Sequence, residues 1–377
     1  MTNTALIFTI YIIITVIWRY MTANEQTLTE IALSFNIEGT VCECLPFGKG
    51  LVNRTYSVTC DSGKRYILQR ISPFFKDVPG LMENIISVTK WIAERAEDPR
   101  ETMAVLLAKD GKGWVTTKDG NFRMYEFVEG TLCMQRAETA DDFEESGKGF
   151  GRFLERLSDF PIETLHETLP NFHDTPSRYR TLHDSLENDV CDRAKYVRRE
   201  TDFAFEREEE AGLLHRMRVS GELPTRVTHN DTKLNNILFD KATRKALCVI
   251  DLDTVMPGLS LYDFGDAIRF GASTADGDET DLSLVNSDLR LFEAFTRGFL
   301  SACPGLTAKE KAHLVQGAKT MTLECGVRFL TDFLEGDRYF SVSRENHNLD
   351  RARTQFKLVE DMEKKWDEML SIVEKYS

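Results

Sequence analysis

The spacing of hydrophobic positions changes near residue 130. Between residues 40 and 130, apolar side chains fall in short β-rich runs separated by glycine turns, as in "TVCECLPFGKGLVNRTYSVTC" and "KRYILQRI", which predicts strands. One stretch has a different period, because four of its apolar residues recur at helical spacing: Leu81, Ile85, Val88 and Ile92. The order predicts three strands, a helix and two or three further strands, in a small and mostly antiparallel sheet.

Helical spacing dominates after Gly130. Apolar residues three and four positions apart run through three long segments, residues 140–160, 177–218 and 351–376. One predicted strand hairpin, built from "VTHNDTKLNNILFD" and "KALCVIDLD", interrupts this pattern. The sequence therefore predicts an α+β chain of two lobes, a small β-rich lobe over residues 21–130 and a larger helical lobe over residues 131–377.

Residues 1–20 form a hydrophobic leader. The segment "TNTALIFTIYIIITVIW" has no charged residue, but it is slightly shorter than the roughly 20 apolar residues that a membrane span requires. It also lacks the basic start and the small-residue cleavage site of a secretory signal. Three interpretations stay open: an upstream or non-native start, a membrane anchor, and a packed strand or helix. Under each of them the first lobe begins at Met21.

Composition narrows the class of protein. With 377 residues, 42% hydrophobic and 29% charged, the chain can bury a large globular core. A net charge of -14 argues against a nucleic-acid-binding surface. The eight cysteines are scattered without a CxxC motif, which favours reduced thiols in a cytoplasmic enzyme over a disulfide framework or a zinc site. Nothing in the composition indicates the oligomeric state.

The loop in "VTHNDTKLNNILFD" has more polar residues than a turn needs. His229, Asp231 and Asn236 follow the pattern H-x-D-x-x-x-x-N, and Asp251 ends the apolar run "ALCVI" fifteen residues later. Two neighbouring strands can thus bring two carboxylates and an amide together. Phosphoryl transfer uses such a set, because one Asp orients the attacking hydroxyl while an Asn and another Asp hold Mg²⁺ against the nucleotide phosphates.

These residues resemble the aminoglycoside phosphotransferase and choline kinase superfamily, which is related to protein kinases. The chain is more narrowly similar to the N-acetylhexosamine 1-kinases. That similarity rests on nine segments in order between about residues 48 and 340: "GLVNRTYSV", "YILQRI", "LMENIISVT", "RMYEFVEGT", "PNFHDTPSRYR", "HNDTKLNN", "VIDLDTVMPG", "YDFGDAIR" and "ECGVRFLTDFLEGDRYF". The resemblance implies a protein-kinase-like fold, ATP as co-substrate, Mg²⁺ as cofactor and a small sugar as acceptor.

The resemblance also implies roles for residues of the larger lobe. Asp231 is the expected catalytic base and is also expected to contact the acceptor. Asn236 and Asp251 are the expected magnesium ligands. Lys233 stands where many protein kinases have a lysine that touches the transferred phosphate, although aminoglycoside kinases usually lack it. His229 is expected to brace the loop through backbone hydrogen bonds, because the base position is already filled.

A second acidic motif is an alternative candidate for the metal ligand. "DFG" at 263–265 spells the magnesium motif of protein kinases, but Asp263 lies 32 residues past Asp231, whereas Asp251 lies 20 past it. The shorter spacing suits a hairpin that returns to the same ion. Asp251 is therefore the preferred ligand, Asp253 is a candidate assistant, and Asp263 is expected to anchor a helix start or the catalytic loop.

In the smaller lobe, the expected nucleotide-binding residues are Gly48, Gly50, Arg70, Glu83, Glu126 and Val128. The two glycines allow a backbone to approach phosphates, although a plain hairpin would also use them. Arg70, the expected cation for the phosphates, takes the place of the usual lysine and could pair with Glu83. An exposed strand-end arginine and a surface glutamate are the alternatives. Backbone groups of Glu126 and Val128 would meet adenine.

Arg328 and Tyr339 match sugar-contacting positions of the N-acetylhexosamine 1-kinases, and both can donate to the oxygens of a neutral sugar. A helix-surface ion pair and a core tyrosine are the plainer interpretations. The expected activity is ATP-dependent phosphorylation of the anomeric hydroxyl of N-acetylglucosamine or N-acetylgalactosamine, with no nucleic acid as partner and a membrane only if residues 1–20 are an anchor.

Three rivals stay open. The first is a kinase for another small alcohol, such as an aminoglycoside, an amino alcohol or a hexose. The second is a protein kinase, against which Asn230 stands where the loop arginine is usual. The third is a non-catalytic protein on a kinase scaffold.

Overall fold

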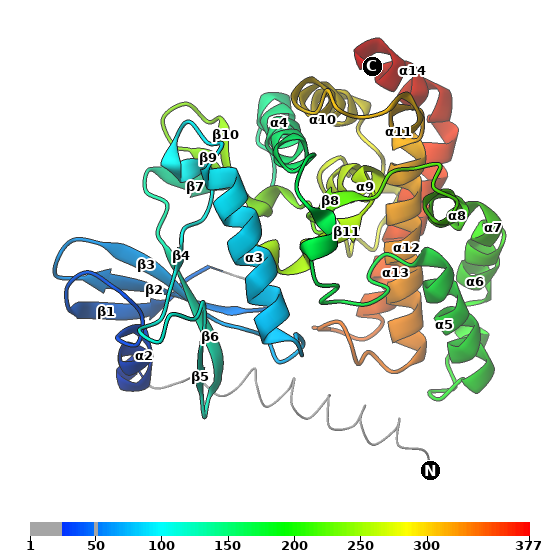
Figure 1. The fold of residues 1–377 in the computed structure, drawn as a ribbon. Coiled ribbons are helices and arrows are strands. Elements are labelled where there is room, and N and C mark those ends of the chain that lie inside the picture. The colour runs from blue at the N-terminus through cyan, green and yellow to red at the C-terminus, as the bar shows by residue number, and fades with distance from the viewer. Residues whose placement is uncertain (1–24, 49–51) are drawn as a thin grey trace. The chain divides into compact units, whose positions relative to one another are not determined.

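The computed structural model of the chain describes residues 25–48 and 52–377 (Figure 1). The predictions made for residues 1–20 and for Gly50 lie outside these described residues. The chain divides into two compact units, residues 1–130 and residues 131–377. Across the described part of the chain, none of the helices combines the length and the apolar character needed to span a membrane.

In its described residues, the first unit is a small antiparallel sheet with two α-helices. Its helices are α2 (Glu25–Ala32) and α3 (Val78–Ala93), and its strands are β1 (Val41–Pro46), β2 (Arg54–Cys60), β3 (Arg65–Arg70), β4 (Val105–Leu106), β5 (Val115–Thr117) and β6 (Gly120–Glu126). The strands are ordered β1-β2-β3-β6-β4, with β5 paired to β6, and every pair is antiparallel. The predicted order of three strands, a helix and three strands is confirmed.

Helix α3 begins where a cap and a proline favour it. The Asp77 carboxylate accepts the backbone N–H of Gly80 at 3.0 Å, and Pro79 stands in the first turn, where its missing N–H leaves no hydrogen bond unmade. The four apolar residues that predicted the helix are all buried. Burial of such a side chain contributes about 1.5–3 kcal/mol, so this face fixes α3 in the unit.

Strand alternation decides which residues of β3 face the core. Tyr66 and Leu68 are buried with residues of α2, and Arg70 lies on the same face by its position in the strand. Gln69 faces the other side, where its side chain donates to Thr55 Oγ1 at 3.1 Å and accepts from Arg123 Nε at 3.0 Å. Gln69 and Arg70 therefore lie on opposite faces of β3.

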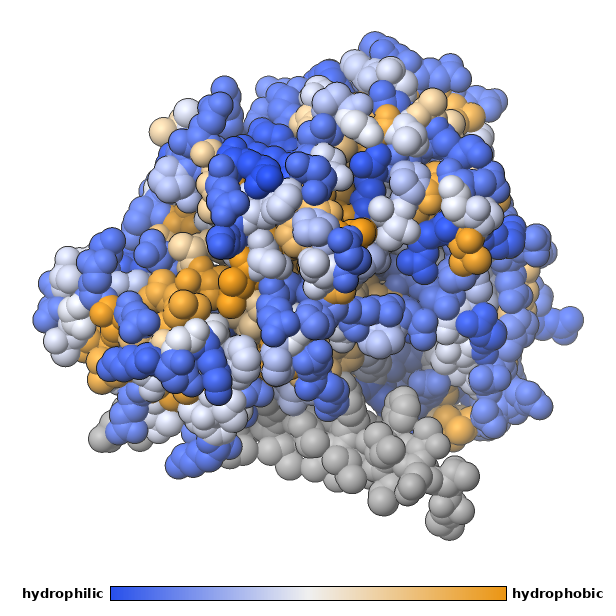
Figure 2. Space-filling model, in the orientation of Figure 1, coloured by the Kyte–Doolittle hydropathy of each residue, from blue (hydrophilic) through white to orange (hydrophobic). Residues whose placement is uncertain are grey.

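Apolar side chains also remain on the surface of the first unit. Figure 2 shows an orange patch beside β3 and β4. Among the residues described in this unit, the large exposed apolar ones are Leu33, Leu45, Phe47, Val52 and Leu107.

The second unit is mainly helical. Its helices are α4 (Ala140–Arg156), α5 (Thr175–Asn188), α6 (Arg198–Phe205), α7 (Glu208–Ala211), α8 (Leu213–Val219), α9 (Ser260–Gly271), α10 (Leu289–Ala302), α11 (Ala308–Ala312), α12 (Leu314–Leu334), α13 (His347–Lys364) and α14 (Trp366–Tyr376). Its strands are β7 (Thr131–Cys133), β8 (Arg226–Thr228), β9 (Ile237–Asp240), β10 (Ala246–Val249) and β11 (Met256–Gly258). They form a three-stranded sheet, β10-β9-β7, and a two-stranded ribbon, β11-β8.

The second unit differs from the prediction in its short strands. The β9–β10 hairpin was expected, whereas β7 and β11 were not, because three residues are too few to show an alternating pattern. Two expected long helices are also divided, since residues 177–218 form parts of four helices and residues 351–376 form parts of two.

Helix α12 runs through the second unit and packs against α9 and α13 (Figure 1). Two glycines permit the approach of α9 and α12. A Cβ at Gly265 would overlap the backbone oxygen of Gly317, and a Cβ at Gly317 would overlap the backbone oxygen of Leu261. This contact sets the distance between the acidic residues of α9 and the polar residues of α12, which together surround the candidate site.

Candidate active site

Asp263 anchors the loop between β8 and β9. The loop contains a short 3-10 turn, Leu234–Asn236, and its first part lies against the start of α9. Asp263, in the first turn of α9, accepts the backbone N–H of His229 at 2.9 Å and that of Asn230 at 2.7 Å. The hydroxyl of Thr232 donates to the Asp263 carbonyl at 2.5 Å. The expectation that Asp263 anchors the catalytic loop is confirmed.

His229 braces the same loop from inside the unit. Its side chain is fully buried, its Nδ1 accepts the backbone N–H of Asp231 at 3.2 Å, and its Nε2 lies 2.9 Å from the carbonyl oxygen of Ile250. Since the N–H of Asp231 is a donor and the Ile250 carbonyl is an acceptor, the ring is the neutral tautomer with its proton on Nε2. The bracing role expected for His229 is confirmed.

Asp231, Lys233 and Asn236 lie together at the end of this loop. Lys233 Nζ is 3.0 Å from Asp231 Oδ2, and Asn236 Nδ2 donates to the carbonyl of Asp231 at 2.7 Å and to its Oδ2 at 3.1 Å. Burial alone would lower the pKa of Lys233, but the charge and the hydrogen bond of Asp231, together with the charges of Asp266 and Asp251, outweigh burial and the pKa is raised. Lys233 is therefore a cation whose charge stabilises the Asp231 carboxylate.

Asp251 stands at the end of the neighbouring strand. Val249 of β10 pairs with Ile237 of β9, and the N–H of Ile250 donates to the carbonyl of Asn236 at 2.9 Å. Asp251 itself has a left-handed backbone, with φ 61° and ψ 56°, and its charge is among the causes that raise the pKa of Lys233. The hairpin thus brings the charge of Asp251 within reach of Lys233, and its role as a magnesium ligand stays a prediction.

The donor set at this place fits a hard divalent cation. Both hydrogen bonds described for the Asn236 side chain are donated by Nδ2, so its oxygen faces away from Asp231. An amide oxygen and the carboxylate of Asp251 are ligands that suit Mg²⁺, which keeps several waters and needs only one or two protein carboxylates. Asp253 is buried two residues further on, and its part in metal binding stays a prediction.

A buried ion pair that no sequence pattern indicates lies beside the loop. Arg269 donates to Asp266 across one turn of α9, with Nε 2.8 Å and Nη2 2.7 Å from Asp266 Oδ1. Burial would raise the pKa of Asp266, but Arg269 and then Lys233 outweigh this and lower it. The charges of Asp231, Lys233, Asp266 and Arg269 therefore belong to one network.

Three aromatic rings surround Arg328 on α12. Its guanidinium carbon lies 5.8 Å from the ring centre of Phe172, 5.8 Å from that of Tyr339 and 5.5 Å from that of Phe340. These are cation–π distances. Arg328 and Tyr339, which were predicted as a pair from the sequence, are brought together, while Phe172 and Phe340 were missed. Tyr339 is 53% exposed, so it is not a core tyrosine.

A second arginine lies beside this cluster. Arg178 Nη2 donates to the carbonyls of Asn171 and Phe172 at 2.9 and 2.8 Å and so fixes the turn that presents Phe172. Burial, and next the charge of Arg328, lower the pKa of Arg178. A second cation, Arg178, therefore lies near Arg328 beside the aromatic cluster, and the charge of Glu324 acts on both arginines.

The nucleotide-binding residues expected in the first unit lie on several separate elements. Gly48 is exposed with φ 76°, which a residue with a Cβ would adopt only with strain. Arg70 of β3 is paired with Arg54 of β2 and lies beside Gly120. Burial, and then the charge of Arg54, lower the pKa of Arg70. Glu83 is exposed on α3, whereas the next residue, Asn84, is buried. An Arg70–Glu83 ion pair stays a prediction.

The segment after β6 is fixed within the first unit. The N–H of Glu126 donates to the Ala104 carbonyl at 2.9 Å, and that of Phe127 donates to the Arg65 carbonyl at 3.1 Å. Arg65 also pairs with Glu129 and stacks 3.8 Å from the Phe127 ring centre. Because the N–H of Glu126 is used in the sheet, contact between Glu126 and adenine would have to use its carbonyl; Val128 stays a candidate for the donor.

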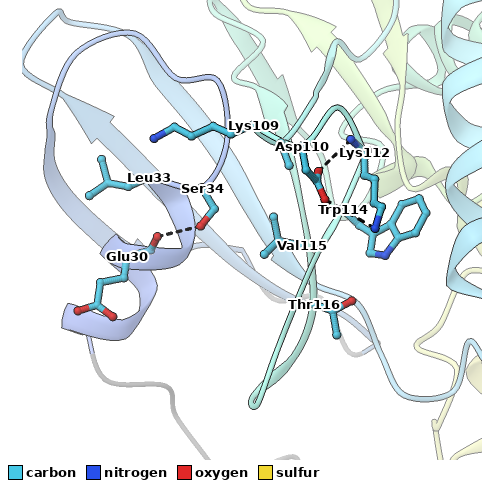
Figure 3. A pocket seen from close by; sticks show the side chains of 10 residues that line it. Glu30, Leu33, Ser34, Lys109, Asp110, Lys112, Trp114, Val115 and Thr116 are labelled. Atoms are coloured by element: carbon cyan, nitrogen blue, oxygen red, sulfur yellow. Dashed lines mark hydrogen bonds and ion pairs between the residues drawn. The ribbon is translucent and has the colours of Figure 1, made fainter.

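The first unit contains a pocket of about 480 Å³ between α2 and the segment from β4 to β5 (Figure 3). Its polar lining includes Lys109, Asp110 and Lys112, with Lys112 Nζ 3.7 Å from Asp110 and facing the ring of Trp114. None of the described residues that the sequence predicted for nucleotide binding lines this pocket.

The comparison with protein families agrees with this geometry. The family model described as "Phosphotransferase enzyme family" matches residues 43–300, which is more than half of the chain. The chain belongs to this family.

Solved structures show the same fold. An aminoglycoside phosphotransferase from Alicyclobacillus acidocaldarius aligns with TM-score 0.64 and 13% identity, over 94% of this chain and 98% of that one. A microcompartment-associated aminopropanol kinase aligns with TM-score 0.57 and 18% identity, over 91% and 98%. An ethanolamine kinase from Plasmodium vivax aligns with TM-score 0.54 and 15% identity, over 85% and 83%. The expected α+β, protein-kinase-like fold is confirmed.

Proposed function

We propose that this phosphotransferase is an ATP- and Mg²⁺-dependent kinase that phosphorylates the anomeric hydroxyl of an N-acetylhexosamine. The first unit would bind the nucleotide through Gly48, Gly50, Arg70, Glu83, Glu126 and Val128. The second unit would supply the base and bind the acceptor. The observation that carries the choice of acceptor is the guanidinium of Arg328, which occupies the centre of the aromatic cluster of Phe172, Tyr339 and Phe340.

Asp231 would orient the acceptor hydroxyl and accept its proton. Asn236 holds the Asp231 side chain by a hydrogen bond at 3.1 Å, and Lys233 contacts the same oxygen at 3.0 Å. The second oxygen of Asp231 is the one that would take the proton. Phosphoryl transfer passes through a loose transition state, so positioning of the reactants and neutralisation of charge supply most of the catalysis. Lys233 could move from Asp231 to the transferred phosphoryl group as its charge develops.

Asn236 and Asp251 would hold the magnesium ion, which neutralises the phosphate charge when bound. The fit rests on the amide oxygen of Asn236 and on the hairpin that places Asp251 beside Lys233. These side chains belong to neighbouring strand ends, so one rigid hairpin would set their spacing.

Arg328 makes a cationic acceptor unfavourable. Aromatic clusters bind ammonium groups by cation–π attraction, but here the chain's own guanidinium takes that place, with Arg178 nearby. An acceptor amine would meet positive charge. The hydroxyl and N-acetyl oxygens of a neutral sugar would accept hydrogen bonds from Arg328 and Tyr339, while Phe172 and Phe340 would pack against apolar parts of the ring.

One observation favours an alternative acceptor. The matched structures are named as kinases of aminoglycosides, aminopropanol and ethanolamine, and Glu324 supplies a carboxylate whose charge acts on Arg328. This carboxylate is already compensated, first by His173 and then by Arg328. For this reason we place the amino alcohols second.

A panel of acceptors tests the proposal. The full chain is incubated with ATP and MgCl₂ and, separately, with N-acetylglucosamine, N-acetylgalactosamine, glucose, an aminoglycoside and ethanolamine. ADP release measures turnover, and phosphorus NMR identifies the phosphorylated position. We expect turnover with an N-acetylhexosamine and a phosphorus signal coupled to the anomeric proton.

The other outcomes separate the rivals. Turnover only with the amines would establish the alternative acceptor class. Label transferred from ATP to protein would indicate a protein kinase. Absence of Mg·ATP binding would indicate a non-catalytic member of the family.

A further inference from the structure

His173 lies between the catalytic loop and helix α12. Its Nε2 is 3.1 Å from the carbonyl oxygen of Asn230, and its Nδ1 is 2.9 Å from Glu324 Oε1. A carbonyl oxygen only accepts hydrogen bonds, so Nε2 carries a proton. Glu324 also accepts the hydroxyl of Thr175, at 2.6 Å on its other oxygen. With Glu324 ionised, Nδ1 carries a proton too, and His173 is an imidazolium.

Carboxylates on two helices interact with His173. Burial would raise the pKa of Glu324, but the charge and the hydrogen bond of His173 outweigh burial and the pKa is lowered. On the other side, α9 presents Asp263 and Asp266, and the charge of His173 favours the ionised form of both. The remaining neighbours are the rings of Phe172 and Tyr262, 4.6 and 5.3 Å away between ring centres. One carboxylate therefore contacts the buried ring, and two more lie within reach of its charge.

The carbonyl that His173 contacts belongs to the peptide bond in front of Asp231. The N–H of that same peptide donates to His229. Two histidines thus hold both polar groups of one peptide, the cationic one at the carbonyl and the neutral one at the N–H. Asn230 has φ 63°, a backbone conformation that a non-glycine residue keeps only when its surroundings hold it.

The other partner of His173 leads to the acceptor residues. Glu324 lies four residues before Arg328 on α12, a spacing that places the two on one helix face. Each charge shifts the pKa of the other group in the direction expected for opposite charges close together. Hydrogen bonds therefore link the peptide before Asp231, through His173, to Glu324, and the charge of Glu324 acts in turn on Arg328.

We propose that His173 is a positioning residue for this reaction, which as an imidazolium ties the backbone before the base Asp231 to Glu324 and so to the acceptor-binding arginine. It would set the distance between the base and the acceptor without touching either. This inference rests on the proposed function for its kinetic consequence, but the protonation of His173 can be tested apart from any acceptor.

The first measurement is nitrogen NMR of the full chain with ¹⁵N-labelled histidine at pH 7, with His173→Gln used to assign the signal. We expect the pattern of a doubly protonated ring for His173 and of a neutral ring with one proton for His229. A neutral ring at His173 would overturn the proposal, whichever acceptor the enzyme uses.

The second measurement is steady-state kinetics of His173→Gln and Glu324→Gln with the acceptor that the wild type uses. We expect kcat to fall about 10- to 100-fold, as for an error in positioning, while the KM for ATP changes little. The double variant should lose little more than either single one, because both remove the same contact. The matched control is His183→Gln, since His183 is 50% exposed and pairs with Glu208 on the surface of the same unit.

Two kinetic results would contradict the positioning role of His173. Values of kcat within twofold of the control, in variants that unfold at the same temperature as the wild type, would show that His173 is not needed for positioning. Fully additive losses would show that His173 and Glu324 act separately. If the wild type transfers no phosphoryl group to any acceptor, the proposed function fails, and the NMR result still decides the state of His173.

Discussion

Asp263 Oδ1 accepts the backbone N–H of Asn230 at 2.7 Å and holds that residue at φ 63°. Asp263→Asn would turn one of the two accepting oxygens into an NH₂ group that faces an N–H donor. Hydrogen bonds to a charged group contribute about 1.5–3 kcal/mol, so we expect a loss of ~2 kcal/mol in the free energy of unfolding and a clear fall in kcat. Urea unfolding and turnover of the variant measure the two effects. Asp281→Asn is the control, because Asp281 caps an exposed 3-10 turn.

The raised pKa of Asp263 predicts that the free energy of unfolding depends on pH. Burial raises its pKa to about 6, although His229 and its other partners oppose this, while an unfolded Asp titrates near about 3.9. Between roughly pH 4 and pH 6 the folded chain binds this proton and the unfolded chain does not. The contribution of Asp263 to the free energy of unfolding therefore falls as pH rises through this window and is constant above it.

The asparagine variant lacks this titration. The free energy of unfolding of the wild type minus that of the variant should decrease from pH 4 to pH 6, by on the order of 3 kcal/mol. Urea titrations at three pH values measure the difference. A difference that stays constant or increases over this range would mean that Asp263 has no raised pKa.

Lys233 is predicted to act in catalysis through its charge. In Lys233→Met the cation beside Asp231 is removed while much of the side-chain volume is kept. We expect kcat to fall at least about tenfold, in line with the loss of one well-placed charge, with less change in the KM for ATP. Lys241→Met, in the β9–β10 turn, is the exposed control. Equal kcat values in the two variants would limit Lys233 to a structural contact.

Substitution of Arg328 or Asp332 should raise the KM for the acceptor and leave the KM for ATP unchanged. Asp332 accepts the backbone N–H groups of Arg338, Tyr339 and Phe340 at 2.7–2.9 Å, so it holds the segment that places two rings around Arg328. We expect Arg328→Ala and Asp332→Asn each to raise the KM for the acceptor at least about tenfold, the cost of a lost charged hydrogen bond. Arg290→Ala, with a side chain 87% exposed, is the control. Parallel increases in the KM for ATP would argue against an acceptor site here.

The proposed metal ligands should change the magnesium requirement. Asp251→Asn and Asn236→Ala each alter one oxygen ligand on neighbouring strand ends. We expect the Mg²⁺ concentration for half-maximal rate to rise about 10- to 100-fold, because each variant weakens a hard-ion site of few protein ligands. Titration of the rate with MgCl₂ at saturating ATP measures this. Asp240→Asn, at the last residue of β9, is the control; an unchanged requirement in Asp251→Asn would remove Asp251 from the site.

The sequence predicted the loop chemistry because its residues are close along the chain. Asp231, Lys233 and Asn236 share one turn, and a hairpin returns Asp251 to it, so local spacing alone brings them together. The buried face of α3 was also predictable, since four apolar residues at helical spacing must lie on one side.

The contacts that depend on packing between distant segments were not predictable. His173 meets Glu324 over 151 residues, and Phe172 approaches Arg328 over a similar separation, in a helical unit whose chain path no local pattern indicates. The close approach of Gly265 and Gly317 is equally non-local. The strands β7 and β11 were missed for another reason, because three residues do not show a period.

The substitution Asp231→Asn tests the central claim most directly. The variant keeps the size of the side chain and loses the carboxylate that would take the acceptor proton, with exposed Asp202→Asn on α6 as the control. Single-turnover transfer from labelled ATP to the sugar and calorimetric binding of Mg·ATP are measured on the same samples. We predict that transfer falls at least about 100-fold, the contribution of general base catalysis, while Mg·ATP binds as in the wild type. Transfer at the rate of the control would contradict the role of Asp231 and the active site built around it.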